Sequence, residues 1–109
     1  MTATFEVVAE ESRRRILDLL VEEERAVGDL VDRLSLSQPT VSKHLKVLRE
    51  AGLVEARIDA QRRIYWVRPE PLREIDEWLS PYRRRWAAQL NALERHLEIM
   101  DGTEQEGWA

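Results

Sequence analysis

The chain of 109 residues contains no cysteine, so disulfides, thiolate metal sites and thiol nucleophiles are excluded. It has no apolar run of about 18 residues, the length that a membrane-crossing helix requires. Its N-terminus carries no basic segment followed by an apolar one, as a secretory signal would. We therefore expect a cytoplasmic, nucleoid-associated protein without a membrane partner. At this length we expect one domain, which is small for an enzyme with its own substrate cleft.

The chain also lacks an overall excess of positive charge, since its formal net charge is −4 at pH 7. Affinity for DNA comes largely from neutralising phosphates, so this value alone argues against nucleic acid. The distribution reverses that conclusion. Residues 38–68 hold seven basic and three acidic side chains, a net +4, whereas residues 1–37 and residues 69–109 each sum to −4. A local basic segment of this kind is the electrostatic footprint of a nucleic-acid-binding protein.

Histidine is scarce, and neither His44 nor His96 has a nucleophile with an orienting acid nearby in the sequence. We therefore predict that the chain is not an enzyme. Glu94 and Glu98 flank His96 at two residues on either side, so on a helix they point in different directions. We predict no metal site and no cofactor.

The stretch from Ser37 to Ala51 reads as one helix, with Ser37 as N-cap, Pro39 in its first turn and Gly52 as its stop. Its apolar stripe consists of Val41, His44, Leu45 and Leu48. The opposite face carries Pro39, Lys43, Lys46 and Glu50, with Gln38, Thr40 and Ser42 near the start. Short hydrogen-bonding groups beside positive charge are typical of a helix that enters the DNA major groove.

Apolar spacing predicts three earlier helices, over residues 4–11, 12–23 and 26–34. The third, a turn and the helix from Ser37 together form a helix-turn-helix. Ser12 is the expected N-cap of the second helix, and Glu22–Arg25 is expected to close it in solvent. Residues 13–15 are three arginines that oppose the helix dipole, so they need solvent, the nearby glutamates or a phosphate as compensation.

After Gly52 the apolar period changes to two, which predicts a β-hairpin from strands over residues 53–58 and 62–68. Arg62 and Arg63 stand at its tip beside Arg57. Such a basic wing next to a recognition helix can touch the sugar–phosphate backbone or the minor groove. Alternatively, the arginines only keep an edge strand soluble.

The C-terminal part is expected to form a helix over residues 71–79 and, restarted by Ser80 and Pro81, a final helix to about Met100. The final helix carries a heptad-like seam, formed by Tyr82, Trp86, Leu90, Leu93, Leu97 and Met100. Burying this seam and the face of Phe5 and Val8 against a second copy gives a homodimer; the alternative is that the helix folds back onto its own domain. Trp78 and Trp86 could line an effector pocket or serve ordinary packing. Residues 101–109 are expected to form a flexible tail.

Three stretches, residues 12–20, 27–30 and 36–54, resemble the ArsR family of winged-helix bacterial repressors. The pattern Ser-Gln-x-x-x-Ser-x-His-Leu begins at Ser37 and ends at Leu45. The resemblance implies a dimer on an inverted-repeat operator, with the positions of Gln38, Pro39, Ser42 and Lys43 near bases. Two departures matter. Residues 27–34 lack the thiols of metal-sensing members, and Ala60-Gln61 replaces the Gly followed by Arg that is common in the wing turn.

The sequence thus predicts a mainly α fold with a small β-hairpin, a winged helix-turn-helix with N- and C-terminal dimerisation helices, over residues 1–100. We expect a sequence-specific regulator of transcription, a dimeric repressor bound to double-stranded DNA. The alternative is a winged-helix module that binds protein instead. The expected DNA-binding residues are Ser37, Gln38, Pro39, Thr40, Ser42, Lys43, Lys46, Arg62 and Arg63. The operator, the regulated genes and any small-molecule effector stay open.

Overall fold

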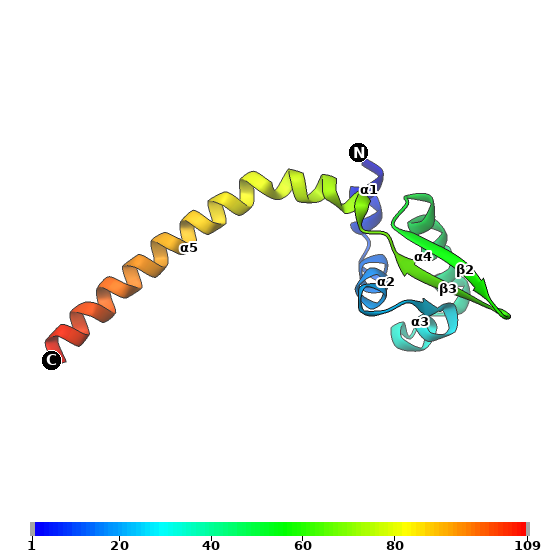
Figure 1. Cartoon of the computed structure of the whole chain (residues 1–109), viewed down its shortest axis with the longest axis horizontal. Coiled ribbons are helices and arrows are strands. Elements are labelled where there is room, and N and C mark those ends of the chain that lie inside the picture. The colour runs from blue at the N-terminus through cyan, green and yellow to red at the C-terminus, as the bar shows by residue number, and fades with distance from the viewer. Residues whose placement is uncertain (1, 109) are drawn as a thin grey trace. The chain divides into compact units, whose positions relative to one another are not determined.

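The computed structural model describes the backbone of residues 2–108 and the side chains of residues 3–100. Its helices are α1 (Thr2–Val8), α2 (Glu11–Glu22), α3 (Val27–Leu34), α4 (Gln38–Glu50), the 3-10 helix η1 (Glu70–Leu72) and α5 (Arg73–Trp108); its strands are β1 (Arg25–Ala26), β2 (Val54–Asp59) and β3 (Arg62–Val67) (Figure 1). Helices α3 and α4 form the helix-turn-helix, and β2 and β3 form the wing. The predicted winged helix-turn-helix fold is confirmed. The chain divides after Ile75 into two compact units.

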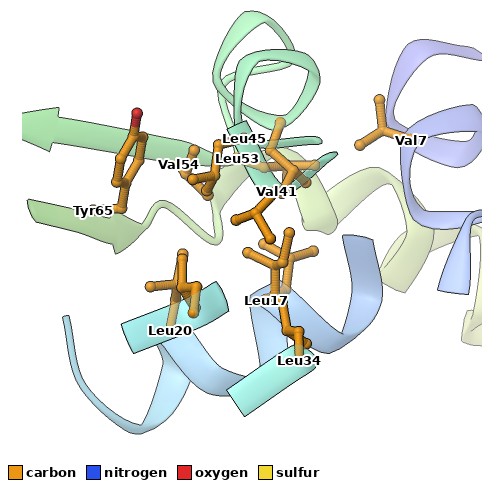
Figure 2. Close-up of a cluster of buried hydrophobic side chains, with 12 residues drawn as sticks. Val7, Leu17, Leu20, Leu34, Val41, Leu45, Leu53, Val54 and Tyr65 are labelled. Atoms are coloured by element: carbon orange, nitrogen blue, oxygen red, sulfur yellow. The ribbon is translucent and has the colours of Figure 1, made fainter. Parts of the chain in front are cut away.

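The first unit is built on a core to which α1, α2, α3, α4 and the hairpin all contribute (Figure 2). The predicted apolar face of α4 is confirmed, because Val41, Leu45 and Leu48 are completely buried. Figure 2 shows Val41 and Leu45 of α4 meeting Leu17 of α2 in the interior. Full burial of such side chains stabilises the folded chain by about 1.5–3 kcal/mol each. The core therefore fixes which face of α4 is left for solvent.

The wing belongs to a three-stranded antiparallel sheet with the strand order β1-β3-β2. Strand β1 was not predicted, because two residues carry no periodic signal. Arg25 in β1 lies opposite Tyr65 of β3 and is only 5% exposed. The expectation that Arg25 ends a helix in solvent was wrong. Because β1 pairs with β3, Arg25 is buried. Its guanidinium therefore requires hydrogen-bond acceptors from the protein in place of water.

Helix α2 begins at Glu11, and its N-cap is Glu10, two residues before the predicted N-cap Ser12. The Glu10 carboxylate accepts hydrogen bonds from the backbone N–H groups of Ser12 (3.2 Å) and Arg13 (3.3 Å). The Ser12 bond is the main cause that lowers the pKa of Glu10. Arg14 donates to the carbonyls of Val8 (2.7 Å) and Ala9 (3.0 Å). This arginine therefore closes the end of α1.

The prediction of two separate C-terminal helices was wrong, because α5 runs through Pro81 without a break. Proline removes one backbone donor from a helix, but it does not force a restart when the residues on both sides stay helical. The Ser80 hydroxyl accepts a hydrogen bond from Arg84 at 2.9 Å, and Asp76 accepts one from Arg83 at 2.7 Å. These side-chain bonds lie within the continuous helix.

The six seam residues of α5 are each between 45% and 58% exposed within the single chain. The ring centroids of Trp78 and Tyr82 lie 5.3 Å apart in a tilted arrangement, and Trp78 and Trp86 are 54% and 50% exposed. The side chains of the predicted tail, residues 101–109, lie outside the described residues.

Candidate nucleic-acid interface

The start of α4 is organised by Ser37, which is the N-cap that its sequence predicts. Its hydroxyl oxygen accepts the backbone N–H of Thr40 at 3.3 Å and lies 2.8 Å from the Thr40 hydroxyl. Pro39 follows in the first turn, where its missing N–H costs nothing. This arrangement fixes the first turn and leaves Gln38 and Pro39 exposed on it.

The outer face of α4 consists of polar side chains whose positions follow from the buried stripe. Ser42, Lys43 and Lys46 are exposed, and Thr40 is half-buried. His44, which was expected on the apolar stripe, is half-buried, with its Nδ1 atom 3.6 Å from a carboxylate oxygen of Glu10. The structure thus places the predicted base-contacting residues on one accessible helix face.

The wing brings its basic tip next to α4. In the register of the hairpin, Ala56 lies opposite Tyr65 and Ile58 lies opposite Arg63, so these pairs share one face of the sheet. A groove of about 490 Å³ lies between that face and α4; it is lined by Ser42, Leu45, Lys46, Arg49 and Glu50 of α4 and by Arg63 and Tyr65 of β3. Three residues predicted to contact DNA, Ser42 and Lys46 of α4 and Arg63 of the wing, therefore border one groove.

A second groove, of about 470 Å³, connects the first turn of α4 with the wing tip and the start of α3. Gln38, Arg62 and Arg63 line it together with Gly28 at the open start of α3. No atom lies within 4 Å of the position that a Gly28 side chain would occupy. Of the residues predicted to contact DNA, Gln38, Ser42, Lys46, Arg62 and Arg63 therefore line two neighbouring grooves that share Arg63, whereas Ser37, Pro39, Thr40 and Lys43 line neither.

The cations of residues 38–68 fall into two groups. In the first group a guanidinium nitrogen lies close to a carboxylate oxygen. The distance is 3.6 Å between Arg49 and Glu55, 3.9 Å between Arg68 and Glu55, and 3.6 Å between Arg68 and Glu70. Arg57 forms an ion pair with Glu24. Over the described part of the chain, by contrast, the charged groups of Lys43, Lys46, Arg62 and Arg63 form no ion pair. All four side chains are exposed; Lys46, Arg62 and Arg63 place positive charge along the two grooves, and Lys43 places it on the outer face of α4.

Sequence reasoning missed Arg49 and Tyr65, which line the first groove. The position of Arg49 could have been found, because it follows Ser42 by seven residues and Lys46 by three on the same helix. Tyr65 could not, because its place in the groove depends on the register between β2 and β3.

Within the ranges that the structure describes, no three His, Cys, Asp or Glu side chains gather in a way that could hold a metal ion. Over the same ranges, no helix has the length and apolar character needed to span a membrane.

A family model described as the bacterial regulatory protein, arsR family, matches residues 10–56, from the N-cap of α2 into β2. The HTH-type transcriptional regulator Rv2034 of Mycobacterium tuberculosis is 41% identical over 97 residues, which span 89% of this chain and 85% of that protein. The chain belongs to the ArsR family. This result confirms the resemblance that the pattern from Ser37 to Leu45 indicated.

Two other relatives are named for opposite regulatory effects, one as a repressor and one as an activator. The transcriptional repressor SdpR of Bacillus subtilis is 28% identical over 79 residues, which span 72% of this chain and 88% of that protein. The transcriptional activator HlyU of Vibrio cholerae is 39% identical over 75 residues, which span 69% of each. A solved structure of HlyU from Vibrio cholerae, 36% identical, matches with a TM-score of 0.62 and covers 74% of this chain and 89% of the chain in that structure. For two further Mycobacterium tuberculosis relatives, 40% identical over 72 residues, the chain spans 63% of their length.

Proposed function

We propose that this ArsR-family chain is a sequence-specific regulator of transcription that binds double-stranded DNA. Helix α4 enters the major groove, and the wing contacts the adjacent backbone or minor groove. One observation carries the proposal. Lys43, Lys46, Arg62 and Arg63 are exposed and form no ion pair within the described residues. Lys46, Arg62 and Arg63 line two adjoining grooves, and Lys43 lies on the outer face of α4 beside them. Phosphates are the ligands that such an arrangement of unneutralised cations attracts.

The residues of α4 take different roles in this proposal. Gln38 presents an amide that can form two hydrogen bonds with an adenine edge, and Lys43 presents a donor to guanine or phosphate. Thr40 and Ser42 bond a base or a phosphate, and Pro39 packs against the groove wall. Ser37 contributes through its cap, because its hydroxyl already accepts the Thr40 N–H. Lys46, Arg62 and Arg63 bind the phosphate backbone.

We further propose that the active form is a homodimer held by the α5 seam together with Phe5 and Val8. The six seam residues are exposed in the single chain and recur at spacings of three and four along α5. A two-fold dimer places two recognition helices about 34 Å apart, which matches two half-sites of an inverted repeat. Bound over a promoter, such a dimer blocks RNA polymerase and acts as a repressor. A small-molecule effector of this dimer is not identified.

Titration of duplex DNA at several salt concentrations tests DNA binding. The duplexes are the inverted repeats upstream of the protein's own gene and random sequences of the same length, labelled for fluorescence anisotropy. We expect tighter binding to one inverted repeat and an affinity that falls steeply as salt rises. Absence of binding to every duplex, or affinity independent of salt, contradicts the proposal and favours the protein-binding module.

Replacing Leu93 by Glu tests the dimer. A charged side chain in the middle of an apolar seam opposes its burial, so the variant is expected to sediment as a monomer. Asn91→Glu is the matched control, because it adds the same charge two residues away on another side of the helix. It is expected to remain dimeric, as wild type is. A Leu93→Glu protein that still sediments as a dimer removes the seam from the interface.

A further inference from the structure

The two faces of the wing have different neighbours. Ile58, Arg63 and Tyr65 share the face next to α4, whereas Arg57 lies opposite Ile64 on the other face. That second face borders the turn between α2 and β1. Arg57, Asp59, Arg62 and Ile64 line a polar groove there together with Glu24 and Arg25. Arg57 is therefore turned away from the groove that α4 forms with the wing.

Arg57 makes a forked ion pair with Glu24, which lies 33 residues earlier in the chain. Its Nη1 atom donates to Oε2 of Glu24 at 2.9 Å, and its Nη2 atom donates to Oε1. This hydrogen bonding lowers the pKa of Glu24 and raises the pKa of Arg57. The paired geometry orients both planar groups, which a single contact between long side chains would not do.

Trp66 supports the same arginine from the wing itself. The guanidinium carbon of Arg57 lies 5.6 Å from the centre of a Trp66 ring, within the range of a cation–π contact. Arg57 is thus held on β2, against a side chain of β3, and by a carboxylate of the turn before β1. The Arg57–Glu24 pair joins β2 to this turn, and the Arg49–Glu55 pair joins β2 to α4 nearer the base of the hairpin.

We propose that Glu24 and Arg57 are positioning residues that set the wing against α4, so that Arg62 and Arg63 reach the DNA that α4 binds. The inference rests on the proposed DNA-binding function. Arg57 orients the wing through its ion pair with Glu24. It does not itself bind phosphate, because Glu24 already neutralises its charge. The pair is half-exposed, with both side chains at 47%, so it contributes little to overall stability.

If Glu24 positions the wing, removing its side chain changes the DNA affinity in the direction opposite to that expected from charge alone. Removing an acidic side chain from a DNA-binding protein makes it more positive, which by itself strengthens binding to phosphates. If Glu24 holds the wing, its removal instead weakens binding, because the wing arginines lose their fixed position relative to α4. The sign of the change therefore separates the two effects.

The experiment measures the affinity of three proteins for one duplex at fixed salt: wild type, Glu24→Gln and the double variant Glu24→Arg/Arg57→Glu, in which the two charges are exchanged. Asp32→Asn is the matched control, since Asp32 is an exposed carboxylate of α3 without an ion pair among the described residues. Glu24→Gln is expected to bind roughly tenfold more weakly, and Asp32→Asn as tightly as wild type or tighter. The double variant is expected to bind DNA with an affinity within about threefold of wild type. Such a recovery would not occur if Glu24→Gln bound more weakly only because it had lost stability.

Amide hydrogen exchange in the free protein gives a readout that does not depend on DNA. In Glu24→Gln the amides of β2 and β3 toward the wing tip are expected to exchange faster, while those of α4 keep the wild-type rates. Binding by Glu24→Gln that equals or exceeds wild type, or unchanged exchange in the wing, overturns the inference. Failure of the wild-type protein to bind any duplex would instead overturn the proposed function, and the exchange rates would still decide whether Glu24 holds the wing.

Discussion

Arg25 and Lys43 are both basic residues of the same unit, yet their surroundings differ completely. Arg25 is buried at the corner of α2, β1 and α3, and its guanidinium donates to the Leu19 carbonyl (3.0 Å), Glu22 (2.8 Å), Glu23 (3.3 Å) and Asp29 (2.9 Å). Lys43 is exposed on α4 and forms no ion pair within the described residues. Pairing thus separates cations that hold the fold together from cations that are free to bind a phosphate.

The comparison also explains why the total charge is a poor guide to function. Part of the basic charge in residues 38–68 is neutralised inside the molecule, by Glu24, Glu55 and Glu70. The four cations that remain are concentrated on α4 and on the wing tip. Their positions, more than their number, support the DNA-binding proposal.

Replacing Arg25 by Ala is expected to have the largest effect. The change removes four hydrogen bonds at a buried corner and leaves three carboxylates close together, so the thermal midpoint is expected to fall by about 10 °C. Circular dichroism during heating measures the midpoint. Arg62→Ala is the control for loss of an unpaired arginine and is expected to leave the midpoint unchanged. A midpoint equal to wild type in Arg25→Ala would contradict the structural role of Arg25.

Replacing Lys43 by Ala tests the exposed cation that forms no ion pair among the described residues. This exposed side chain is expected to contribute about 1.4 kcal/mol to binding, which is roughly a tenfold change in affinity, and nothing measurable to stability. Anisotropy titration and thermal unfolding of the same sample measure both quantities. Unchanged affinity would remove Lys43 from the interface, and a large fall in the midpoint would show that it supports the fold instead.

The Arg25 corner also makes stability depend on pH. The hydrogen bond from Arg25 is the main cause that lowers the pKa of Asp29, and Arg33 adds to it. A carboxylate with a lowered folded-state pKa stabilises the protein above its ordinary pKa of about 4, and this contribution is lost as the pH falls further. The thermal midpoint of Asp29→Asn is therefore expected to fall less between pH 5 and pH 3 than that of wild type. The same steep fall in both proteins would contradict the assignment, with Asp32→Asn as the control.

The smallest expected effect concerns the turn of the helix-turn-helix. Ser35 caps α3 with a φ of 56°, in the left-handed region where a side chain costs energy. Ser35→Gly is expected to raise the free energy of unfolding by about 0.5 kcal/mol, the relief of strain being partly offset by the flexibility of glycine in the unfolded chain. Chemical denaturation measures this change. A lower unfolding free energy would show that the Ser35 side chain itself stabilises the turn.

Ala60 at the wing tip provides a second test of the same principle, because its φ is 58° in the two-residue turn between β2 and β3. Ala60→Gly is expected to give a similar small increase in stability, with DNA affinity close to wild type. Clearly weaker binding would indicate that a more flexible tip costs affinity.

The sequence predicted those parts of the structure whose signals are local. The cap at Ser37, the apolar stripe of Val41, Leu45 and Leu48, and the strands on both sides of Ala60 each follow from neighbouring residues. Together these predictions located α4, the wing and every residue proposed to contact DNA. They needed no knowledge of distant contacts.

Features that depend on distant contacts escaped the prediction. Arg25 is buried because β1 pairs with β3, about 40 residues later, and two residues of strand leave no pattern to read. Glu10 displaces Ser12 as N-cap because its longer side chain reaches two backbone N–H groups. The proline rule failed at Pro81, because helical residues on both sides continue α5 across one missing hydrogen bond. Likewise, only the structure shows that Arg57 is already neutralised by Glu24.

The salt dependence of DNA affinity tests the distinction between paired and unpaired cations most directly. It is measured for wild type, for a variant with Lys43, Lys46, Arg62 and Arg63 all changed to Gln, and for the control Arg33→Gln/Arg68→Gln, which removes two paired arginines outside the two grooves. Each phosphate contact contributes about 0.9 to the slope of log affinity against log salt. The fourfold variant is therefore expected to lose about three to four from the slope per protomer, and the control to keep the wild-type slope. Equal slopes for wild type and the fourfold variant would contradict the assignment of these four side chains to DNA.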